Sequence, residues 1–265
     1  MKVNDLFFEL SHEGRYKVLQ SISKKRKKHM HLEKELGLTG PEVSRHLKRL
    51  QEAKLIQKTV EGDYQITSFG KMICSVTAFF ENSLNLADFI NTHNFENIPL
   101  EILFQIICLS DVELGTKTME NIELWAELIK KSNRYIYAIT DQLQTSVIPI
   151  TQKKVQSGTS FDIKAIIDRK LLEKFTKSEY LIPKANELLK QIDFFNSVRL
   201  SEELDLSLII TDNGAIIFLR AGDSIDYSKC IFSKSEDFLK LTKKIFDLYW
   251  HKAIIIKPSN LPLKL

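Results

Sequence analysis

Three basic side chains share one face of a predicted helix at residues 39–56. At about 100° per residue, Arg45, Lys48 and Arg49 point away from the apolar stripe of this helix. Guanidinium and ammonium groups form charge-assisted hydrogen bonds with phosphate oxygens, and an arginine also matches the acceptor edge of a guanine. The alternative is a solvated charged surface on an ordinary helix. The helix carries four further candidates for the same chemistry: Thr39, Pro41, Ser44 and His46.

This helix has clear start signals. Thr39 can cap its N-terminus, and Glu42 three residues later completes a capping box, while Pro41 lies in the first turn, where a missing N–H is harmless. Upstream, the segment HLEKELGL at residues 31–38 predicts a short helix that ends in a turn at Gly37. A short helix, a tight turn and a capped second helix form the helix-turn-helix pattern, in which the second helix lies in the major groove of DNA.

A further helix and a hairpin complete this predicted domain. Residues 14–22 predict an amphipathic helix, and residues 57–60 and 64–67 predict two short strands joined by a turn. Together these elements make a winged helix. The stretch VSRHLKRLQEAKLI, the wing and the following YQITSFG resemble the arsenic-repressor-like winged-helix regulators over residues 1–70. Lys54 departs from the resembled pattern, which usually has glycine at this helix end.

The excess positive charge lies in the N-terminal quarter of the chain. Residues 1–70 hold fourteen Lys and Arg against nine Asp and Glu, a net charge of +5, whereas the rest is slightly acidic. A basic patch on one domain is the electrostatic signature of phosphate binding. The basic residues of the loop before the motif, and of the wing, either contact phosphates or form solvated surface. These candidate residues are Lys24, Lys25, Arg26, Lys27, Lys28 and Lys58.

Length and composition indicate a two-domain globular protein. The chain has 265 residues, 43% of them hydrophobic, and no apolar run reaches the roughly 18 residues that span a membrane. Acidic residues interrupt the apolar N-terminal stretch, so no signal peptide is expected. Cys74, Cys108 and Cys230 have no paired spacing, which favours a reducing cytoplasm over a disulfide framework. We therefore expect a cytoplasmic protein with no membrane partner.

One long helix is predicted to follow the wing. Large apolar residues return every three or four positions over residues 68–93. We interpret residues 71–96 as a linker and dimerisation helix, because helix-turn-helix proteins commonly read two half-sites as dimers. The alternative is a helix that packs on the second domain of its own chain.

The remaining residues, 97–265, predict an α/β domain with a mixed sheet. Strand patterns at 134–140 and 161–168 alternate with helical ones, which is typical of a partly parallel sheet. A hairpin at 206–220 is expected to turn at Asn213-Gly214. The expected helices are 119–132, 145–156, 169–176, 183–192 and 236–252. The fold class is thus an α+β winged helix-turn-helix domain, a long linker helix, and an α/β effector domain.

This second domain carries another resemblance. Its α/β segment, the hairpin ITDNGAIIFLR and the terminal FLKLTKKIFDLYWHKAI resemble the effector domain of the archaeal methanogenesis regulatory protein family, in which a winged helix precedes it. The domain is also similar to the effector half of TrmB-like regulators, a phospholipase-D-like fold that has lost its catalytic residues. The resemblance implies a dimeric transcription regulator that senses an unidentified small-molecule effector.

Polar groups near strand ends are the candidates for that effector. Ligands of open α/β sheets lie outside the carboxyl ends of the strands. Each candidate could instead be a helix cap or a surface group. They are Tyr137, Thr140, Asp141, Asp168, Arg169 and Asp212.

Other functional classes find less support in the sequence. No nucleophile elbow, phosphate-binding loop, dinucleotide fingerprint or Cys-x-x-Cys pair occurs, so we expect no enzyme and no cofactor. His29, His31 and His46 lack the spacing of a metal site, although a metal-sensing repressor stays an alternative. A second alternative is an interaction protein, with the winged helix used for protein contact and the α/β domain for docking. We favour a sequence-specific, homodimeric regulator of transcription that binds double-stranded DNA.

Overall fold

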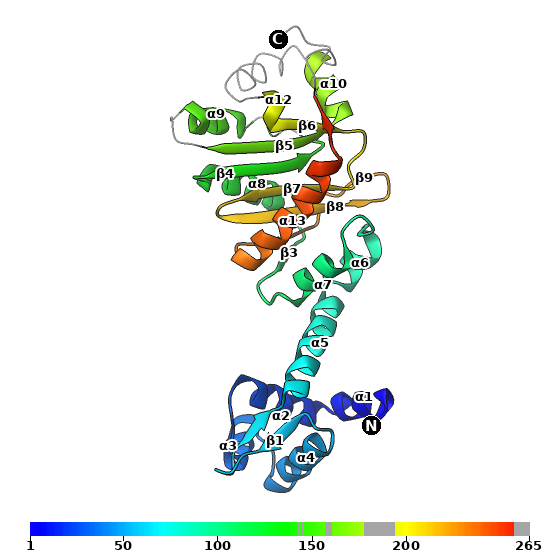
Figure 1. Cartoon of the computed structure of the whole chain (residues 1–265), viewed down its shortest axis with the longest axis vertical. Coiled ribbons are helices and arrows are strands. Elements are labelled where there is room, and N and C mark those ends of the chain that lie inside the picture. Colours follow the sequence, from blue (N-terminus) through cyan, green and yellow to red (C-terminus); the bar gives the residue numbers. More distant parts are fainter. Residues whose placement is uncertain (143, 145, 157–160, 178–193, 257–265) are drawn as a thin grey trace. The chain divides into compact units, whose positions relative to one another are not determined.

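The computed structural model describes residues 1–142, 144, 146–156, 161–177 and 194–256. The chain divides into two compact units, Met1–Asn82 and Ser83–Leu265 (Figure 1). The boundary therefore falls inside the predicted linker helix, which begins in one unit and ends in the other.

The N-terminal unit is a winged helix with one helix more than the sequence predicted. Its helices are α1 (Val3–Ser11), α2 (Glu13–Lys24), α3 (His29–Leu36) and α4 (Gly40–Glu52). The wing consists of β1 (Ile56–Lys58) and β2 (Tyr64–Ile66), which pair antiparallel with Gln57 opposite Gln65. Apolar residues from all of α2, α3, α4 and β1 form its core, among them Val18, Leu19, Ile22, Leu32, Val43, Leu47, Leu50 and Ile56.

The turn after α4 contains Lys54, where the sequence departs from the resembled winged-helix pattern. Lys54 has a φ of 60° and is the one non-glycine residue with positive φ in the described part of the chain. An L-residue is strained in this left-handed conformation, whereas glycine adopts it freely. The left-handed backbone at this position explains why the resembled pattern usually has glycine there.

Lys54→Gly is expected to stabilise the N-terminal unit. Relief of the left-handed strain outweighs the extra chain entropy of glycine, so the free energy of unfolding should rise by about 0.5–1 kcal/mol. Thermal denaturation of the full chain measures this. Lys48→Gly, in the middle of α4, is the matched control and should destabilise by about 1 kcal/mol. A loss of stability in Lys54→Gly would mean that the lysine stem contributes more than its strained backbone loses.

The predicted long helix is two helices. α5 (Ser68–Asn85) is followed by α6 (Ala87–Thr92), and the chain leaves helical geometry at Leu86, which has φ −102° and ψ 5°. The start of α5 packs tightly on the wing and the residue before it. A Cβ at Gly70 would lie 2.1 Å from the carbonyl oxygen of Leu55 and 2.8 Å from Ile66 Cγ1 of β2. The expectation of one continuous helix to residue 93 is therefore wrong in its last turns.

The C-terminal unit is built on one mixed sheet. Its strands follow the order β11-β6-β5-β4-β7-β8-β10-β3, and β9 pairs with β8. β4 pairs parallel with β5, and β5 pairs parallel with β6, whereas the other pairs are antiparallel. The strands are β3 (Glu113–Gly115), β4 (Tyr135–Thr140), β5 (Asp162–Asp168), β6 (Val198–Ser201), β7 (Leu206–Thr211), β8 (Gly214–Ala221), β9 (Ser224–Ile225), β10 (Cys230–Ser233) and β11 (Ile254–Ile255).

Helices cover both faces of the middle of this sheet (Figure 1). Trp125 of α8 packs near Phe218 of β8, while Phe246 of α13 stacks on Tyr137 of β4, and the strand register places these two partners on opposite faces. Because helices cover both faces, the mostly apolar strands β7 and β8 are almost wholly buried. The described helices of this unit are α6, α7 (Leu100–Cys108), α8 (Thr118–Lys131), α9 (Ile148–Gln156), α10 (Arg169–Lys177), α12 (Phe194–Ser197) and α13 (Glu236–Lys252).

Two details of the prediction change. The hairpin loop consists of Asp212 and Asn213, because Gly214 already pairs with Thr211 as the first residue of β8. The helix expected from residue 145 begins at Ile148. The helix expected at residues 183–192 lies outside the described residues. The mixed α/β sheet and the terminal helix are confirmed.

Candidate functional site

The second helix of the motif, α4, has an exposed outer face, on which the Ser44 hydroxyl lies 2.8 Å from His29 Nε2 of α3. The Thr39 amide donates to Glu42 Oε2 at 2.8 Å, and the Thr39 hydroxyl donates to the same oxygen at 2.7 Å, so the predicted capping box exists. These hydrogen bonds lower the pKa of Glu42, which keeps the cap charged. The inner face is buried in the core. The outer positions are exposed: Thr39, Pro41, Ser44, Arg45 and Lys48.

Arg49 is engaged within the protein. Its guanidinium forms an ion pair with Glu9 of α1, and its Nε lies 3.2 Å from Glu9 Oε2. The same carboxylate binds Arg15 Nε at 3.1 Å, and the ring of Phe8 lies under both guanidinium groups. Helix α1, which the sequence did not reveal, therefore neutralises part of the predicted basic face.

His46 departs from its expected position. The side chain faces inward, with 2% of the residue exposed, and its ring centroid lies 4.7 Å from that of His12. A Cβ at Gly14 would lie 3.0 Å from His46 Nε2, so the ring fills the space beside the start of α2. It cannot contact DNA from this position. A residue at the margin of a helical stripe can turn either way, and here the glycine provides room on the inside.

The protonation of His46 links stability to pH. Burial, reinforced by the charges of His12, Arg15 and Arg45, holds the pKa of His46 below its ordinary value of 6.5. The unfolded chain then binds a proton more readily than the folded one. Stability should therefore fall as the pH drops below about 6.5, by up to about 1.4 kcal/mol per pH unit.

His46→Leu is expected to remove this pH dependence of the N-terminal unit. Scanning calorimetry at pH 5, 6 and 7 measures the unfolding transition of the N-terminal unit, which contains the substituted residue. His31→Leu replaces an exposed histidine of the same unit and serves as the control, with the original pH dependence retained. Equal pH dependence in wild type and His46→Leu would show that another group is responsible.

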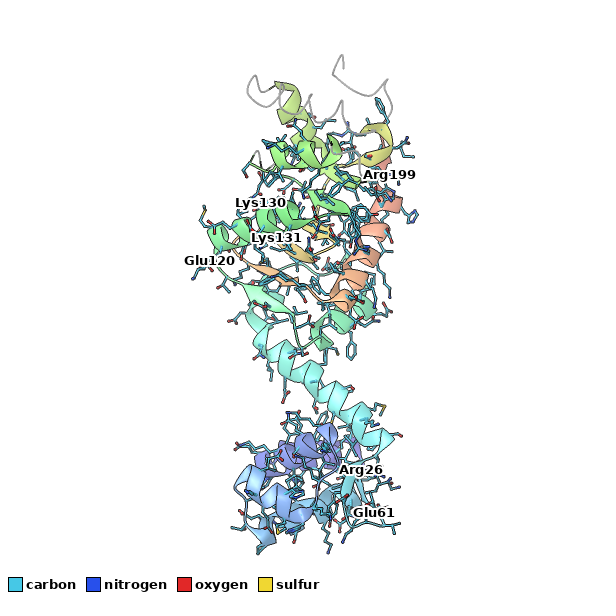
Figure 2. The ribbon with its side chains drawn as sticks, turned by 90° about the vertical axis from the view of Figure 1, so that its left-hand side faces the viewer. Arg26, Glu61, Glu120, Lys130, Lys131 and Arg199 are labelled. Atoms are coloured by element: carbon cyan, nitrogen blue, oxygen red, sulfur yellow. The ribbon has the colours of Figure 1, made fainter. Side chains whose placement is uncertain are left out.

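The basic loop lies beside the wing. The Lys27 amide donates to the Tyr64 carbonyl at 3.1 Å, and the Tyr64 amide donates back at 2.8 Å, so the loop extends the wing sheet. The Lys27 ammonium is paired with Glu35. Figure 2 labels Arg26 and Glu61 together at this end of the unit. A hollow of about 670 Å³ here is lined by Lys25, Arg26, Lys27, Lys28, His31, Lys34, Glu35 and Asp63.

Most of the remaining predicted DNA-contacting groups are accessible. Lys24 lies in the last turn of α2, and Lys25, Arg26 and Lys28 are exposed. The Lys58 ammonium lies 5.7 Å from the ring centre of Tyr64 on the wing. The exposed positive groups thus come from α4, the loop and the wing of a single unit. A polyanion can be bound by such a set without help from the rest of the chain.

The predicted effector residues do not form one cluster. Asp212 accepts hydrogen bonds from the amides of Asn133 and Arg134, at the amino end of β4, whereas Asp141 follows the carboxyl end of the same strand. Asp212 therefore caps a turn, because the hairpin loop folds over the beginning of β4.

The other effector candidates have protein partners as well. The Tyr137 hydroxyl donates to Asp162, and the Tyr227 hydroxyl donates to Asp141. Asp168 accepts from the Leu171 amide at 2.7 Å and so caps α10. Thr140 bonds to the Gln142 backbone, and Arg169 Nε binds Glu202 at 2.7 Å. Satisfied groups of this kind hold strand ends in place.

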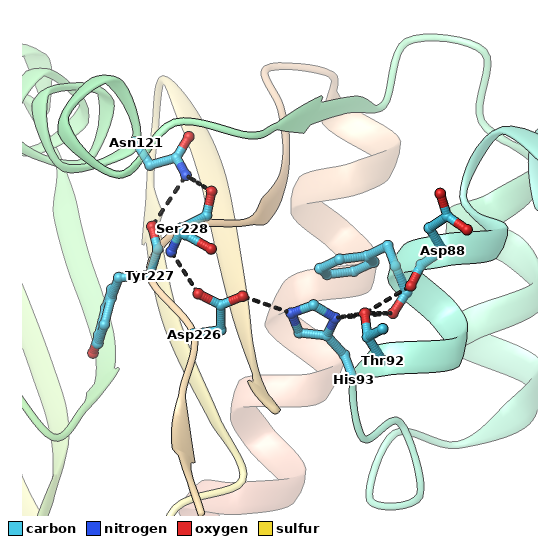
Figure 3. Close-up of polar contacts among 8 residues, drawn as sticks. Asp88, Thr92, His93, Asn121, Asp226, Tyr227 and Ser228 are labelled. Atoms are coloured by element: carbon cyan, nitrogen blue, oxygen red, sulfur yellow. Dashed lines mark hydrogen bonds and ion pairs between the residues drawn. The ribbon is translucent and has the colours of Figure 1, made fainter. Parts of the chain in front are cut away.

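A polar network that the sequence did not reveal joins α6 to the sheet (Figure 3). His93 Nε2 lies 3.2 Å from Asp226 Oδ2, and His93 Nδ1 lies 2.9 Å from the Phe89 carbonyl oxygen. Burial alone would raise the pKa of Asp226, but hydrogen bonds from Ser228 and His93 lower it overall. Beyond Asp226, Asn121 of α8 donates to the Ser228 carbonyl at 3.0 Å. The segment that follows α5 is thereby fixed to the C-terminal unit.

The described residues hold neither a metal-binding cluster nor a membrane-spanning helix. In the described ranges, no group of three or more His, Cys, Asp or Glu is placed to hold a metal ion. Over the same residues, no helix has the length and apolar character needed to cross a membrane.

The family comparison concerns the N-terminal unit. Residues 12–58 match the model of the arsR family of bacterial regulatory proteins. No match was found among curated protein sequences. Among solved structures, an archaeal chromatin protein, TrmBL2, described as showing a novel mode of DNA binding, is similar at 15% identity and a TM-score of 0.42. That similarity covers 91% of this chain and 92% of TrmBL2.

A second solved structure is similar over a smaller part. It is the phosphatidylserine synthase of Haemophilus influenzae, at 14% identity and a TM-score of 0.42, over 58% of this chain and 40% of the synthase. Likenesses at this level carry no functional conclusion. The arsR-family match of residues 12–58 and the geometry of α4 together identify a DNA-binding winged helix-turn-helix domain in the N-terminal unit, the domain of a transcription regulator.

Proposed function

We propose that the protein is a sequence-specific regulator of transcription that binds double-stranded DNA as a homodimer and responds to a small-molecule effector. The observation that carries this proposal is the outer face of α4, where Arg45 and Lys48 are exposed and form no ion pair with the described residues. In a helix-turn-helix, such residues near the front of the second helix contact base edges. Arg45 is the candidate for direct base contact, since arginine binds guanine through two hydrogen bonds.

The neighbouring groups suit the phosphate backbone. Thr39, Ser44 and Lys48 flank Arg45, with Pro41 in the first turn, and the loop and Lys58 extend the basic surface. Phosphate contacts fix the register of a protein on DNA and make its affinity depend on salt. Arg49 can contact DNA only if its ion pair with Glu9 opens. We therefore propose that it holds α4 in position against α1.

The loop prediction can be tested on two lysines. Lys25 and Lys28 are exposed and lack an ion pair among the described residues. Changing both to Gln should reduce the slope of log affinity against log salt by about 1.8 for each copy of the chain on the DNA, and so by about 3.6 for a dimer, because each lost phosphate contact removes about 0.9. Lys27→Gln is the control: its ammonium is already bound by Glu35, so the slope should stay the same. An unchanged slope in the double variant would make the loop ordinary solvated surface.

An exposed apolar stripe on α5 supports the dimer. Met72, Val76, Phe80 and Leu84 recur every four residues and are 55%, 36%, 46% and 76% exposed. Large apolar residues in a row on a helix surface are typical of a contact with another helix. In this proposal the stripe pairs with that of a second copy, which sets the distance between the two α4 helices.

The sensing role rests on the second unit. Its α6 follows α5 directly and is held to the sheet through His93 and Asp226. A ligand that alters this segment can therefore alter α5. We further propose that the protein is a member of the methanogenesis regulatory protein family, which the sequence resemblance implies, and that it is a non-enzymatic, cytoplasmic protein, as its lack of catalytic motifs and its unpaired cysteines suggest. The direct test is binding of the full chain to duplex DNA over a salt series, with random DNA as competitor.

A further inference from the structure

A cavity of about 350 Å³ opens at the carboxyl end of β6. Ser201 ends this strand, Asp205 follows it, and Tyr249 and Lys252 come from the last turns of α13. Ligands of open α/β sheets bind at this edge, and the volume lies in the range of about 300–1,000 Å³ that holds small molecules. The cavity adjoins the Arg169–Glu202 pair, and Asp168 is the strand partner of Ser201 in its lining.

Tyr249, one of the residues that line the cavity, has a buried hydroxyl group. Tyr249 Oη is buried and forms no hydrogen bond with the residues that the structure describes. Burial, and then the charge of Asp205, raises the pKa of Tyr249, so the hydroxyl stays protonated. A buried hydroxyl without a hydrogen-bond partner destabilises the folded protein by about 1–3 kcal/mol. A ligand that binds it would recover that loss.

The same cavity holds one negative charge that no cation balances. Of its three carboxylates, Glu202 is paired with Arg169, and Glu203 is paired with Arg220 at 2.8 Å. Asp205 accepts a hydrogen bond from Asn97 Nδ2 at 2.6 Å and forms no ion pair among the described residues. Lys252, exposed on the rim, does not approach it within ion-pair distance. The cavity thus offers a carboxylate and a hydroxyl to a donor.

We infer that this cavity binds a small organic ammonium ion, which donates hydrogen bonds to Asp205 and to Tyr249 Oη. The unpaired carboxylate of Asp205 disfavours an anionic ligand, and a neutral alcohol leaves its charge unbalanced. Ile166 and Leu200 give the cavity an apolar wall, so an alkyl chain on the ammonium group adds buried surface. The sensing role of this site, but not the site itself, rests on the proposed function.

The site reaches the segment that leads to the linker. Asn97 lies between α6 and α7, and its amide is the present partner of Asp205. An ammonium ion that binds Asp205 competes with Asn97 or shares the carboxylate with it. Binding thereby acts on the chain segment that joins α6 to the sheet domain.

Calorimetric titration of the full chain with n-butylammonium tests the site, at constant ionic strength and without DNA. Saturable binding is expected, with n-butanol and butyrate binding much more weakly. Asp205→Asn should weaken it about 10- to 100-fold, and Tyr249→Phe about two- to tenfold, the ranges for a charged and a neutral hydrogen bond. Asp223→Asn, an exposed change of the same kind outside the cavity, should leave it unchanged.

Three results would overturn the inference. They are no saturable binding, equal binding of butyrate, or an unchanged affinity in Asp205→Asn whose thermal unfolding matches that of wild type. The proposed function fails separately. If n-butylammonium binds as expected but leaves DNA affinity unchanged, the site stands and its sensing role is lost. If DNA does not bind at all, the titration still decides the site.

Discussion

Replacing Val76 and Phe80 by glutamate is expected to convert a dimer into monomers. Both side chains lie on the exposed stripe of α5, whereas Ile73, one turn earlier, is buried in the core of the N-terminal unit. Four carboxylates, two from each copy, would meet in the paired stripe, and burying uncompensated charge costs several kcal/mol. Because each DNA half-site is then bound separately, operator affinity should fall by about 100-fold or more. Sedimentation velocity and operator titration measure the two effects.

A charge-matched variant separates this from a general effect of negative charge. Lys71→Gln with Ser75→Glu changes the net charge by the same two units at exposed positions of α5 outside the stripe. This control should stay dimeric. A folded Val76→Glu, Phe80→Glu variant that also stays dimeric would move the dimer contact elsewhere, with the C-terminal unit the next candidate, and α5 would be only a connector.

Arg45→Ala is expected to weaken binding to the specific site by about 1–3 kcal/mol, the range for a good base contact. Val43 and Leu47 are buried on the inner side of α4, so Arg45 is held outward near the front of the helix. Binding to random DNA should lose much less, since it depends on phosphates. Competition titrations with specific and random duplexes give the ratio directly.

The control for Arg45 comes from the other unit. Arg134 is an exposed arginine before β4, and Arg134→Ala should change neither affinity. Equal losses on specific and random DNA in Arg45→Ala would show that this residue touches only phosphate. In that case, the sequence specificity would have to come from Ser44, Thr39 or the wing.

Local signals in the sequence predicted much of the fold. The capping box of Thr39 and Glu42, the turn at Gly37 and the apolar stripe of α4 are all short-range patterns, and all are present. The terminal helix and the alternation of strands and helices were equally evident. Even the strained Lys54 was marked by a departure from the resembled pattern.

Features that depend on distant contacts were not predictable. Glu9 binds Arg49 forty residues away, and His93 binds Asp226 over 133 residues, so no local spacing reveals either pair. The inward turn of His46 depends on the space beside Gly14. The break at Leu86 was hidden because the apolar period continues through it.

The effector residues show the same limit. Strand ends were predicted well: Asp168 is the last residue of β5, and Arg169 follows it directly. Their partners required the strand order and register, which place Asp212 at the opposite end of β4 from Asp141. The sequence could not reveal Tyr249 as a candidate ligand-binding residue, because its place beside the end of β6 depends on how α13 packs on the sheet.

Selection of duplex DNA from a random pool by the full chain tests the central claim most directly. The recovered sequences are expected to converge on two half-sites related by symmetry, which bind at least about 10³-fold more tightly than random DNA at physiological salt. Sequences that do not converge, with equal affinity for all duplexes, would contradict the claim that this protein reads DNA sequence.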